Sequence, residues 1–361
     1  MTNMEFLSKL KITQKTLRLI AEIDEFKGQW QALGQLAPDR LSALKKIATI
    51  ESIGSSTRIE GVKLTDAEIE RLLTGLQIHS FRSRDEQEVA GYAELMEMIF
   101  SSWKEMPFTE NHIKQFHGVL LKHSDKDERH RGNYKTLPNH VEALDENGKS
   151  LGVIFQTATP FDTPRMMETL IAWTNKAIDD GEYHPLLVIA TFVVRFLAIH
   201  PFQDGNGRLS RAITTLLLLR SGYSYVPFSS MERVIEDNKD GYYLSLRRGQ
   251  STLDADESQL HEWVEFFLEC MVTQKNELQR KVERERLMGA LPPLSNQLVQ
   301  LAREHGRVTV AGAEKVIGAN RNTIKFHLKK LVESGHLKQR GTGRGTWYEL
   351  NHNICLFNPD I

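Results

Sequence analysis

Apolar residues recur at helical spacing through the first hundred residues of the chain. Leu41, Leu44, Ile47 and Ile50 stand three residues apart, which predicts the apolar face of an amphipathic helix. The segment 65–69 begins with threonine and continues with acidic residues, a pattern typical of a helix start. Another apolar stripe, between 86 and 103, indicates a further helix. We therefore expect residues 1–108 to form a helical region.

The pattern changes after one more helix, which we expect near residues 109–122. Turn-forming residues follow, at 131–134, 138–139 and 145–148. The last turn separates two short segments that read as a β-hairpin, 140–144 and 151–156. Helical patterns then resume, at 164–178, 185–199, 208–220 and 260–288. The predicted fold class is mainly α, with a helical core and a small β-hairpin.

The clearest break in the helical pattern is Leu291-Pro292-Pro293. After it, the pattern of three helices and a hairpin predicts a small separate domain at 294–352. We therefore expect three parts: the helical region 1–108, a core with its trailing helix at 109–288, and this C-terminal domain.

Composition narrows the class of protein. Of the 361 residues, 40% are hydrophobic and 26% charged, which fits an ordinary globular protein. Basic and acidic residues nearly cancel, at 46 against 47, so total charge favours neither nucleic acid nor a membrane surface. No signal peptide is recognised, and the apolar stretch 186–199 is too short to span a membrane. Cys270 and Cys355 are far apart, so we expect reduced thiols in a cytoplasmic protein.

The densest chemistry lies between two predicted helices, in the twelve residues HPFQDGNGRLSR at 200–211. His200 can take a proton near neutral pH. Asp204 offers the hard oxygen that a nucleotide-bound magnesium ion needs. Glycines at a helix start let backbone amides converge on an anion, and Arg208 and Arg211 share one helical face. A plain helix–turn–helix corner would explain a lone histidine or glycine pair, but this combination favours a phosphate-handling site.

This segment resembles the Fic-family motif HPFx[DE]GNGRxxR and matches it at every defining position. The resemblance extends over roughly residues 50–270. It implies a protein adenylyltransferase in which His200 deprotonates a Ser, Thr or Tyr hydroxyl of a target protein, and Asp204 holds Mg²⁺. It also implies an ATP site built by neighbouring residues: Asp204, Gly205, Asn206, Gly207, Arg208, Leu209, Ser210 and Arg211.

Other segments extend the resemblance. The hairpin is similar to the family's target-docking flap, and Lys135 stands where arginine is usual. Tyr242 and Tyr243 resemble the segment that lines the adenine pocket, although two core aromatics would give the same pattern. Gln250 stands where the family often has asparagine.

Residues 56–61 resemble the family's inhibitory motif [ST]xxxE[GN]. Ser56 is four residues before Glu60, so both lie on one helical face, and Gly61 suits a helix end. The resemblance implies that Glu60 pairs with Arg211 and takes the place of the γ-phosphate of ATP. Whether Glu60 also supports the removal of AMP, and whether a homodimer forms, stays open.

The C-terminal segment resembles a winged helix with a basic surplus, and Arg321 to Lys330 would lie in the recognition position. Binding of DNA and contact with a protein are equally compatible with this pattern. We therefore expect an AMP transferase inhibited by Glu60, which acts on a target protein and on itself. The alternative is a DNA-binding regulator in which the Fic domain is subordinate. Because His200, Asp204, Asn206 and both arginines are intact, the sequence favours the enzyme.

Overall fold

The protein is described here from a computed structural model. It describes residues 6–7, 10–32, 38–75, 81, 83–144, 150–253, 255, 258–289 and 291–351. The chain divides into two compact units, Met1–Gln279 and Arg280–Ile361. Helix α11 (Leu260–Gly289) begins in the first unit and continues past this division, and α12 begins at Pro293.

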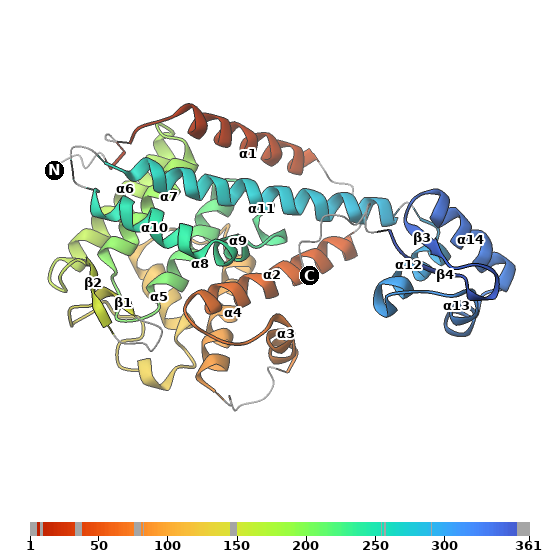
Figure 1. The fold of residues 1–361 in the computed structure, drawn as a ribbon. Helices are drawn as coiled ribbons and strands as arrows, with labels where there is room; N and C mark the ends of the chain where they lie inside the picture. Colours follow the sequence, from red (N-terminus) through yellow and green to blue (C-terminus); the bar gives the residue numbers. More distant parts are fainter. Residues whose placement is uncertain are drawn as a thin grey trace. The chain divides into compact units, whose positions relative to one another are not determined.

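Two buried helices form the centre of the first unit. Helix α7 (Pro185–Ile199) and helix α8 (Asn206–Arg220) bury nearly all of their residues. Helix α7 is apolar on almost every face, which suits a fully buried helix, whereas the first turns of α8 also bury polar and charged side chains. Both helices lie among the other helices of this unit in Figure 1. These are α1 (Gln14–Ala32), α2 (Pro38–Ile59), α3 (Asp66–Thr74), α4 (Arg84–Ser102), α5 (Glu110–Leu120), α6 (Thr163–Asp180), α9 (Met231–Asp237) and α10 (Lys239–Ser251), with short 3₁₀ turns at Asp125–Asp127 (η1) and Val226–Phe228 (η2).

The mainly helical fold class predicted from the sequence is confirmed. The helix expected from Leu41 to Ile50 is part of α2, but the expected apolar face is wrong in detail. Leu44 and Ala48 are buried, whereas Ile47 is exposed. A spacing of four residues keeps a side chain closer to one face than a spacing of three, so the buried stripe runs through Ala48.

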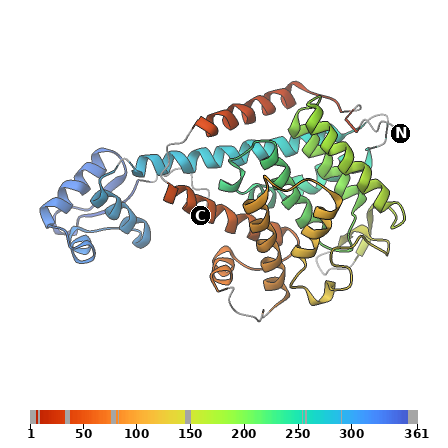
Figure 2. The ribbon, with the colours of Figure 1, turned by 180° about the vertical axis from the view of Figure 1, so that it is seen from behind.

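Helices α1 and α11 lie side by side in both Figure 1 and Figure 2. Ion pairs join them at both ends of the contact, because Lys15 lies 3.2 Å from Glu265 and Lys275 lies 2.8 Å from Glu22. The predicted hairpin is present as the antiparallel strands β1 (His140–Leu144) and β2 (Ser150–Gln156). The turn expected at 145–148 lies outside the described residues.

The second unit contains helices α12 (Pro293–His305), α13 (Val310–Ile317) and α14 (Arg321–Glu333). An antiparallel pair of strands, β3 (Leu337–Arg340) and β4 (Trp347–Leu350), follows them with a 3₁₀ turn (η3, Gly343–Gly345) between. The side chain of Asn320 accepts from the amide of Asn322 at 2.8 Å and caps α14. Leu298, Ile324 and Leu328 are fully buried in the core of this unit. Within the described residues, none of the helices combines the length and the apolar character that crossing a membrane requires.

Candidate active site

His200 ends helix α7 in a left-handed backbone conformation, with φ 52°. It is the one non-glycine residue with positive φ in the part of the chain that the structure describes, and such backbone strain clusters at functional sites. Its Nδ1 atom lies 3.3 Å from the carbonyl oxygen of Leu197, which leaves Nε2 for chemistry. Burial lowers the pKa of His200 to about 4. The ring is therefore neutral near pH 7 and can accept a proton.

The loop after His200 is anchored to the core by Phe202. This ring is fully buried and stacks on His117, with ring centroids 3.9 Å apart. The Asn206 side chain accepts from the Phe202 amide at 2.9 Å and donates to the Phe202 carbonyl at 2.7 Å. Asn139 donates to the same carbonyl, also at 2.7 Å. The Asn206 side chain thus holds the loop in place, whereas a phosphate contact was expected of it.

Lys135 also stabilises the loop that follows His200. Its ammonium group donates to the carbonyl oxygen of Ile199 and to the side chains of Asn139 and Thr157, at 2.8–2.9 Å. Its backbone amide donates to Pro201 at 2.9 Å. Burial lowers the pKa of Lys135 to about 8. The lysine found in place of the family's arginine therefore positions the loop that carries His200.

The start of helix α8 has the backbone geometry that an anion nest requires. Gly205 adopts φ 78° and precedes Asn206, the first residue of α8, so the first amides of the helix lack acceptors within it. Leu209 is fully buried in the core, and the Ser210 hydroxyl donates to the Gly207 carbonyl at 2.8 Å. These two side chains therefore contribute packing and helix structure.

Arg208 is buried and donates to Glu88 of α4 at 2.7 Å. Arg84, one turn earlier in α4, donates to the other oxygen of Glu88 at 2.6 Å. Neither Glu88 nor Arg84 was among the residues predicted from the sequence. The available signal was that Glu88 lies four residues before Tyr92, so it places a carboxylate on the buried face of that helix.

Asp204 lies at the edge of this cluster. One of its oxygens accepts from the Gly205 amide at 2.6 Å. Burial would raise the pKa of Asp204, but Arg208, the Gly205 amide and two further cations outweigh it, so the pKa lies below its ordinary value. The carboxylate is therefore ionised at neutral pH. Among the described residues, His, Cys, Asp and Glu side chains do not gather into a metal-binding group of three.

Arg211 is occupied by the end of helix α2. It donates to Glu60 at 2.7 Å, to the Ser56 hydroxyl at 2.9 Å and to the Ser56 carbonyl at 2.8 Å. A methyl group on Gly207 would lie 2.2 Å from Glu60, so this carboxylate rests directly on the first turn of α8. Gly61, with φ 103°, turns the chain away after Glu60.

The electrostatics of this pair are mutually reinforcing. Burial would raise the pKa of Glu60, but Arg211 outweighs it and holds the pKa below its ordinary value. Burial would lower the pKa of Arg211, but Glu60 raises it above its ordinary value. Both groups are therefore charged at neutral pH, and the predicted meeting of Ser56, Glu60 and Arg211 is present in the structure.

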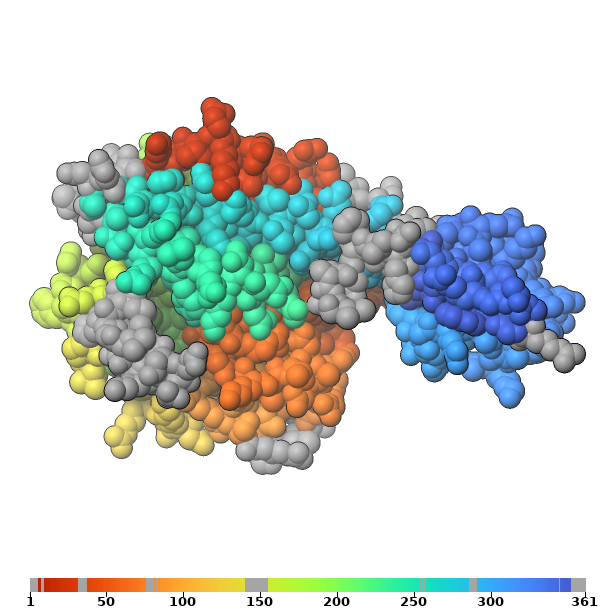
Figure 3. Space-filling view, in the orientation of Figure 1, coloured from red at the N-terminus to blue at the C-terminus, as the bar shows by residue number. Residues whose placement is uncertain are grey.

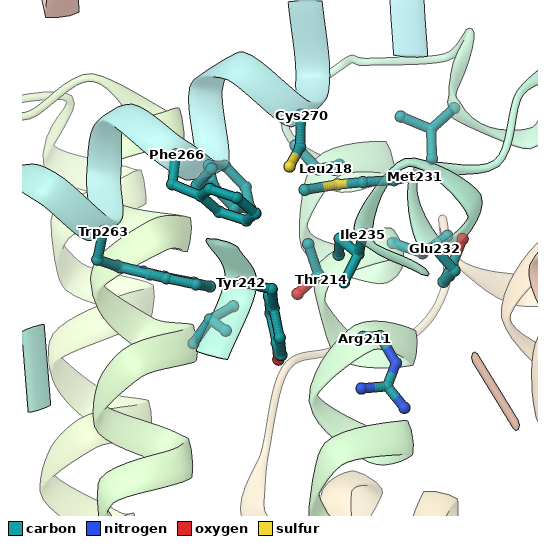
Figure 4. Close-up of a pocket in the computed structure, with 14 residues that line it drawn as sticks. Arg211, Thr214, Leu218, Met231, Glu232, Ile235, Tyr242, Trp263, Phe266 and Cys270 are labelled. Atoms are coloured by element: carbon teal, nitrogen blue, oxygen red, sulfur yellow. The ribbon is translucent and has the colours of Figure 1, made fainter. Parts of the chain in front are cut away.

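The structure separates the three residues expected near the adenine. Tyr242 is buried and lines an apolar pocket with Trp263 and Phe266, whereas Tyr243 is exposed. In Figure 4, Arg211 lies at the opposite end of this pocket from Phe266 and Cys270. The pocket encloses about 20 Å³, enough for one water molecule but not for a base.

Gln250 lines a different cavity of about 440 Å³. The end of β2 contributes Phe155 and Gln156 to it, and α7 contributes Ile199, the residue before His200. Arginines from α6 and α7, Arg165 and Arg195, complete its polar lining. Tyr242 and Gln250 therefore face different spaces in this structure.

Part of this chain is similar in sequence to known proteins. Residues 107–218 match the sequence model of the Fic/DOC family. Protein adenylyltransferase Fic of Drosophila virilis is 27% identical over 257 residues, which cover 70% of this chain and 47% of the relative. The protein of the same name from Drosophila mojavensis is 27% identical over 278 residues, which cover 74% and 50%. The chain thus spans about half the length of these curated relatives.

Solved structures share the fold. A Fic family protein from Desulfovibrio desulfuricans has a TM-score of 0.62 at 23% identity, covering 95% of this chain and 97% of the other. A Fic domain containing signaling protein from Bacteroides thetaiotaomicron has a TM-score of 0.59 at 25% identity, covering 73% and 97%. Together with the complete motif at 200–211, the match to the Fic/DOC family model shows that residues 107–218 are similar to a Fic domain, and the solved Fic structures share the fold.

Proposed function

We propose that the protein is an adenylyltransferase that transfers AMP from ATP to the hydroxyl group of a protein side chain. The observation that carries this proposal is the arrangement of residues 200–211. A neutral, buried histidine ends α7 directly before an anion nest at the start of α8, and two arginines follow on that helix. Relatives named protein adenylyltransferase Fic support the same reaction.

Residues 200–211 can support this transfer in a single displacement at the α-phosphorus. Nε2 of His200 accepts the proton of the target hydroxyl, whose oxygen forms a bond to the α-phosphorus. The bond from the α-phosphorus to the oxygen that bridges to the β-phosphate breaks, and pyrophosphate leaves. Amides at the start of α8, with Arg208 and Arg211, stabilise the charge on the phosphates. The modified protein then carries AMP as a phosphodiester.

Asp204 fits a magnesium ion that arrives with the nucleotide. Such ions are held by one or two carboxylates and by substrate phosphates, so a single ionised Asp204 suffices. Asp204 would hold such an ion, which would supply positive charge to the phosphates of the nucleotide. A fixed metal centre built from protein side chains alone does not match this donor set.

The contact between Glu60 and Arg211 supports autoinhibition. Glu60 occupies the guanidinium that the γ-phosphate requires, so ATP bound beside it would place its α-phosphate out of line. The negative charge of Glu60 acts to raise the pKa of His200, although burial outweighs it. A role for Glu60 in removing AMP again is part of this proposal. ATP as the substrate and the free thiol of Cys270 both suit the cytoplasm.

Labelled ATP tests the reaction class. The full chain is incubated with a lysate and either α-³²P-ATP or γ-³²P-ATP. We expect label on protein from the α position only, and its loss in the His200→Ala variant while ATP binding persists. Label from the γ position would instead identify a kinase, and an active His200→Ala variant would remove His200 from the mechanism.

A second candidate function, DNA binding, rests on charge in the second unit. Residues 280–361 contain 14 Lys and Arg against 7 Asp and Glu, a net charge of +7. Because the chain as a whole carries −1, residues 1–279 carry −8. Arg321, Lys325 and Lys329 of α14 are exposed, and the order of elements suits a winged helix. The side chain of Arg344 lies outside the described residues.

A further inference from the structure

Three cations from three separate elements surround the Asp204 carboxylate. Arg208 of α8 and Lys126 of η1 each lie 3.6 Å from one of its oxygens, and Arg84 of α4 lies 3.8 Å away. These distances exceed that of a hydrogen bond. Electrostatic attraction therefore keeps these cations near Asp204, without direct hydrogen bonds to its carboxylate.

Glu88 arranges two of these cations. Because Arg84 and Arg208 bind different oxygens of one carboxylate, their guanidinium groups are held side by side. The Nε atom of Arg208 is buried without a hydrogen-bond partner in the described part of the chain. Glu88 is 9% exposed, whereas Arg84 is 56% and Lys126 is 60% exposed. Arg84 and Lys126 are therefore the charged groups of this cluster that are most accessible to an anion from solvent.

The two arginines of α8 are already engaged by acidic residues. Glu60 binds Arg211, and Glu88 binds Arg208. The positive charge of each guanidinium group is therefore partly neutralised, so each attracts a triphosphate less strongly than an unpaired arginine would. The start of α8 supplies only a partial positive charge. A chain of phosphates that leaves the nest at α8 toward Asp204 would reach Arg84 and Lys126 next.

We propose that Arg84 and Lys126 form a second cationic side of the nucleotide site, which binds the polyphosphate of ATP beyond the α-phosphate and the departing pyrophosphate. This inference rests on the proposed adenylyltransferase function and extends the site beyond the residues of the motif. An arginine fork suits phosphate oxygens, and a lysine adds a mobile point charge. The two residues raise affinity for a nucleoside triphosphate but not for a nucleoside monophosphate.

Calorimetric titration of the full chain with ATP and with AMP tests the proposal. Both ligands are titrated in the Glu60→Gly background, where Arg211 is free. We expect Arg84→Met and Lys126→Met each to weaken ATP binding roughly fivefold to tenfold, the size of one charge contact to phosphate, and to leave AMP binding unchanged. Arg84→Lys keeps the charge and should restore most of the affinity for ATP.

Lys122→Met is the matched control. Lys122 is 55% exposed and pairs with Glu94 at 2.7 Å, away from Asp204. Its loss should leave both affinities unchanged. The proposal is wrong if ATP binding is unchanged in the Arg84 and Lys126 variants, or if ATP and AMP binding are weakened equally. It is also wrong if Lys122→Met has an equal effect. If the parent protein binds no ATP and transfers no label, the proposed function itself falls.

Discussion

At the scale of single residues, the proposed inhibition depends on the contact between Glu60 and Arg211. Arg211 makes three hydrogen bonds to the end of α2, and two of them go to Ser56. Glu60 adds the only charge among these three contacts. Removing Glu60 therefore frees the terminal part of the guanidinium but leaves Ser56 to keep Arg211 in place.

Glu60→Gly should raise AMP transfer, including self-modification. Opening a hydrogen bond to a charged group costs about 1–3 kcal/mol, which corresponds to roughly a ten- to hundredfold change in rate if opening limits productive binding. Initial rates with one target and one ATP concentration measure the change. Modified product should also persist if Glu60 assists the reverse reaction.

Glu60→Gln and Glu70→Gln form a matched pair of controls. Glu70 is exposed and pairs with Lys46, away from the nucleotide site. We expect Glu60→Gln to activate transfer and Glu70→Gln to leave it unchanged. If Glu60→Gly transfers AMP no faster than the wild type and binds ATP with unchanged affinity, then Glu60 does not inhibit the reaction.

At the scale of elements, helix α9 contacts the end of α2, which leads into Glu60. Arg58 donates to both oxygens of Glu236, at 2.6 and 3.0 Å, and to Asp66 of α3 at 2.8 Å. Ser52 donates to Glu232, one turn earlier in α9, at 2.6 Å. Figure 3 shows this junction at the surface, where orange atoms of α2 and α3 meet teal atoms of α9 and α10. Glu60 is therefore positioned by contacts made by the turn before it.

Arg58→Met should weaken the inhibition without touching Glu60 or Arg211. Loss of the bidentate pair lets the last turn of α2 move, so we expect AMP transfer to rise several-fold, roughly half the logarithmic effect of Glu60→Gly. Rates and thermal unfolding are measured together. Lys46→Met is the control, because Lys46 pairs with Glu70 at the exposed side of the same helix.

Glu236→Gln separates inhibition from stability. This variant keeps Arg58 and removes the negative charge that binds its guanidinium group. Its rate of AMP transfer should therefore rise, as in Arg58→Met. Equal rates for the wild type, Arg58→Met and Glu236→Gln, in a protein that Glu60→Gly activates, would show that α9 plays no part in the inhibition.

At the scale of the whole molecule, charge is distributed unequally along the chain. A near-neutral total conceals −8 on residues 1–279 and +7 on residues 280–361. Part of the positive charge is paired within the second unit, since Arg321 lies 3.4 Å from Glu314 and Lys330 lies 3.3 Å from Glu333. Arg321, Lys325 and Lys329 are nevertheless exposed on α14, where a DNA backbone would neutralise their charge.

The full chain should bind duplex DNA in a salt-dependent manner. Replacing Arg321, Lys325 and Lys329 by alanine removes three phosphate contacts, so we expect at least roughly tenfold weaker binding and a salt slope lower by about 2–3. Fluorescence anisotropy over a range of salt concentrations measures both. A variant with Lys46, Lys63 and Lys176 replaced serves as the control. Absence of binding at low salt would favour a protein-contact role for the second unit.

The sequence by itself determined the helical class, the hairpin and the candidate chemistry at 200–211. These features are local: helical periodicity repeats within one turn or two, and the base, the anion nest and both arginines lie in twelve consecutive residues. The inhibitory motif at 56–61 was recognised for the same reason, since Ser56 and Glu60 are one turn apart. Even so, periodicity misplaced Ile47, because three-residue spacing drifts around a helix.

Tertiary structure decided which partner each of these groups binds. Glu88 and Arg208 are 120 positions apart, and Arg58 and Glu236 are 178 positions apart, so only packing of whole helices brings them together. Packing also determines that the Asn206 side chain hydrogen-bonds to the backbone of Phe202, and that Tyr242 and Gln250 line different cavities. Spacing along a chain specifies the face of a helix, but the neighbour that covers this face depends on how all the helices bury their apolar surfaces at once.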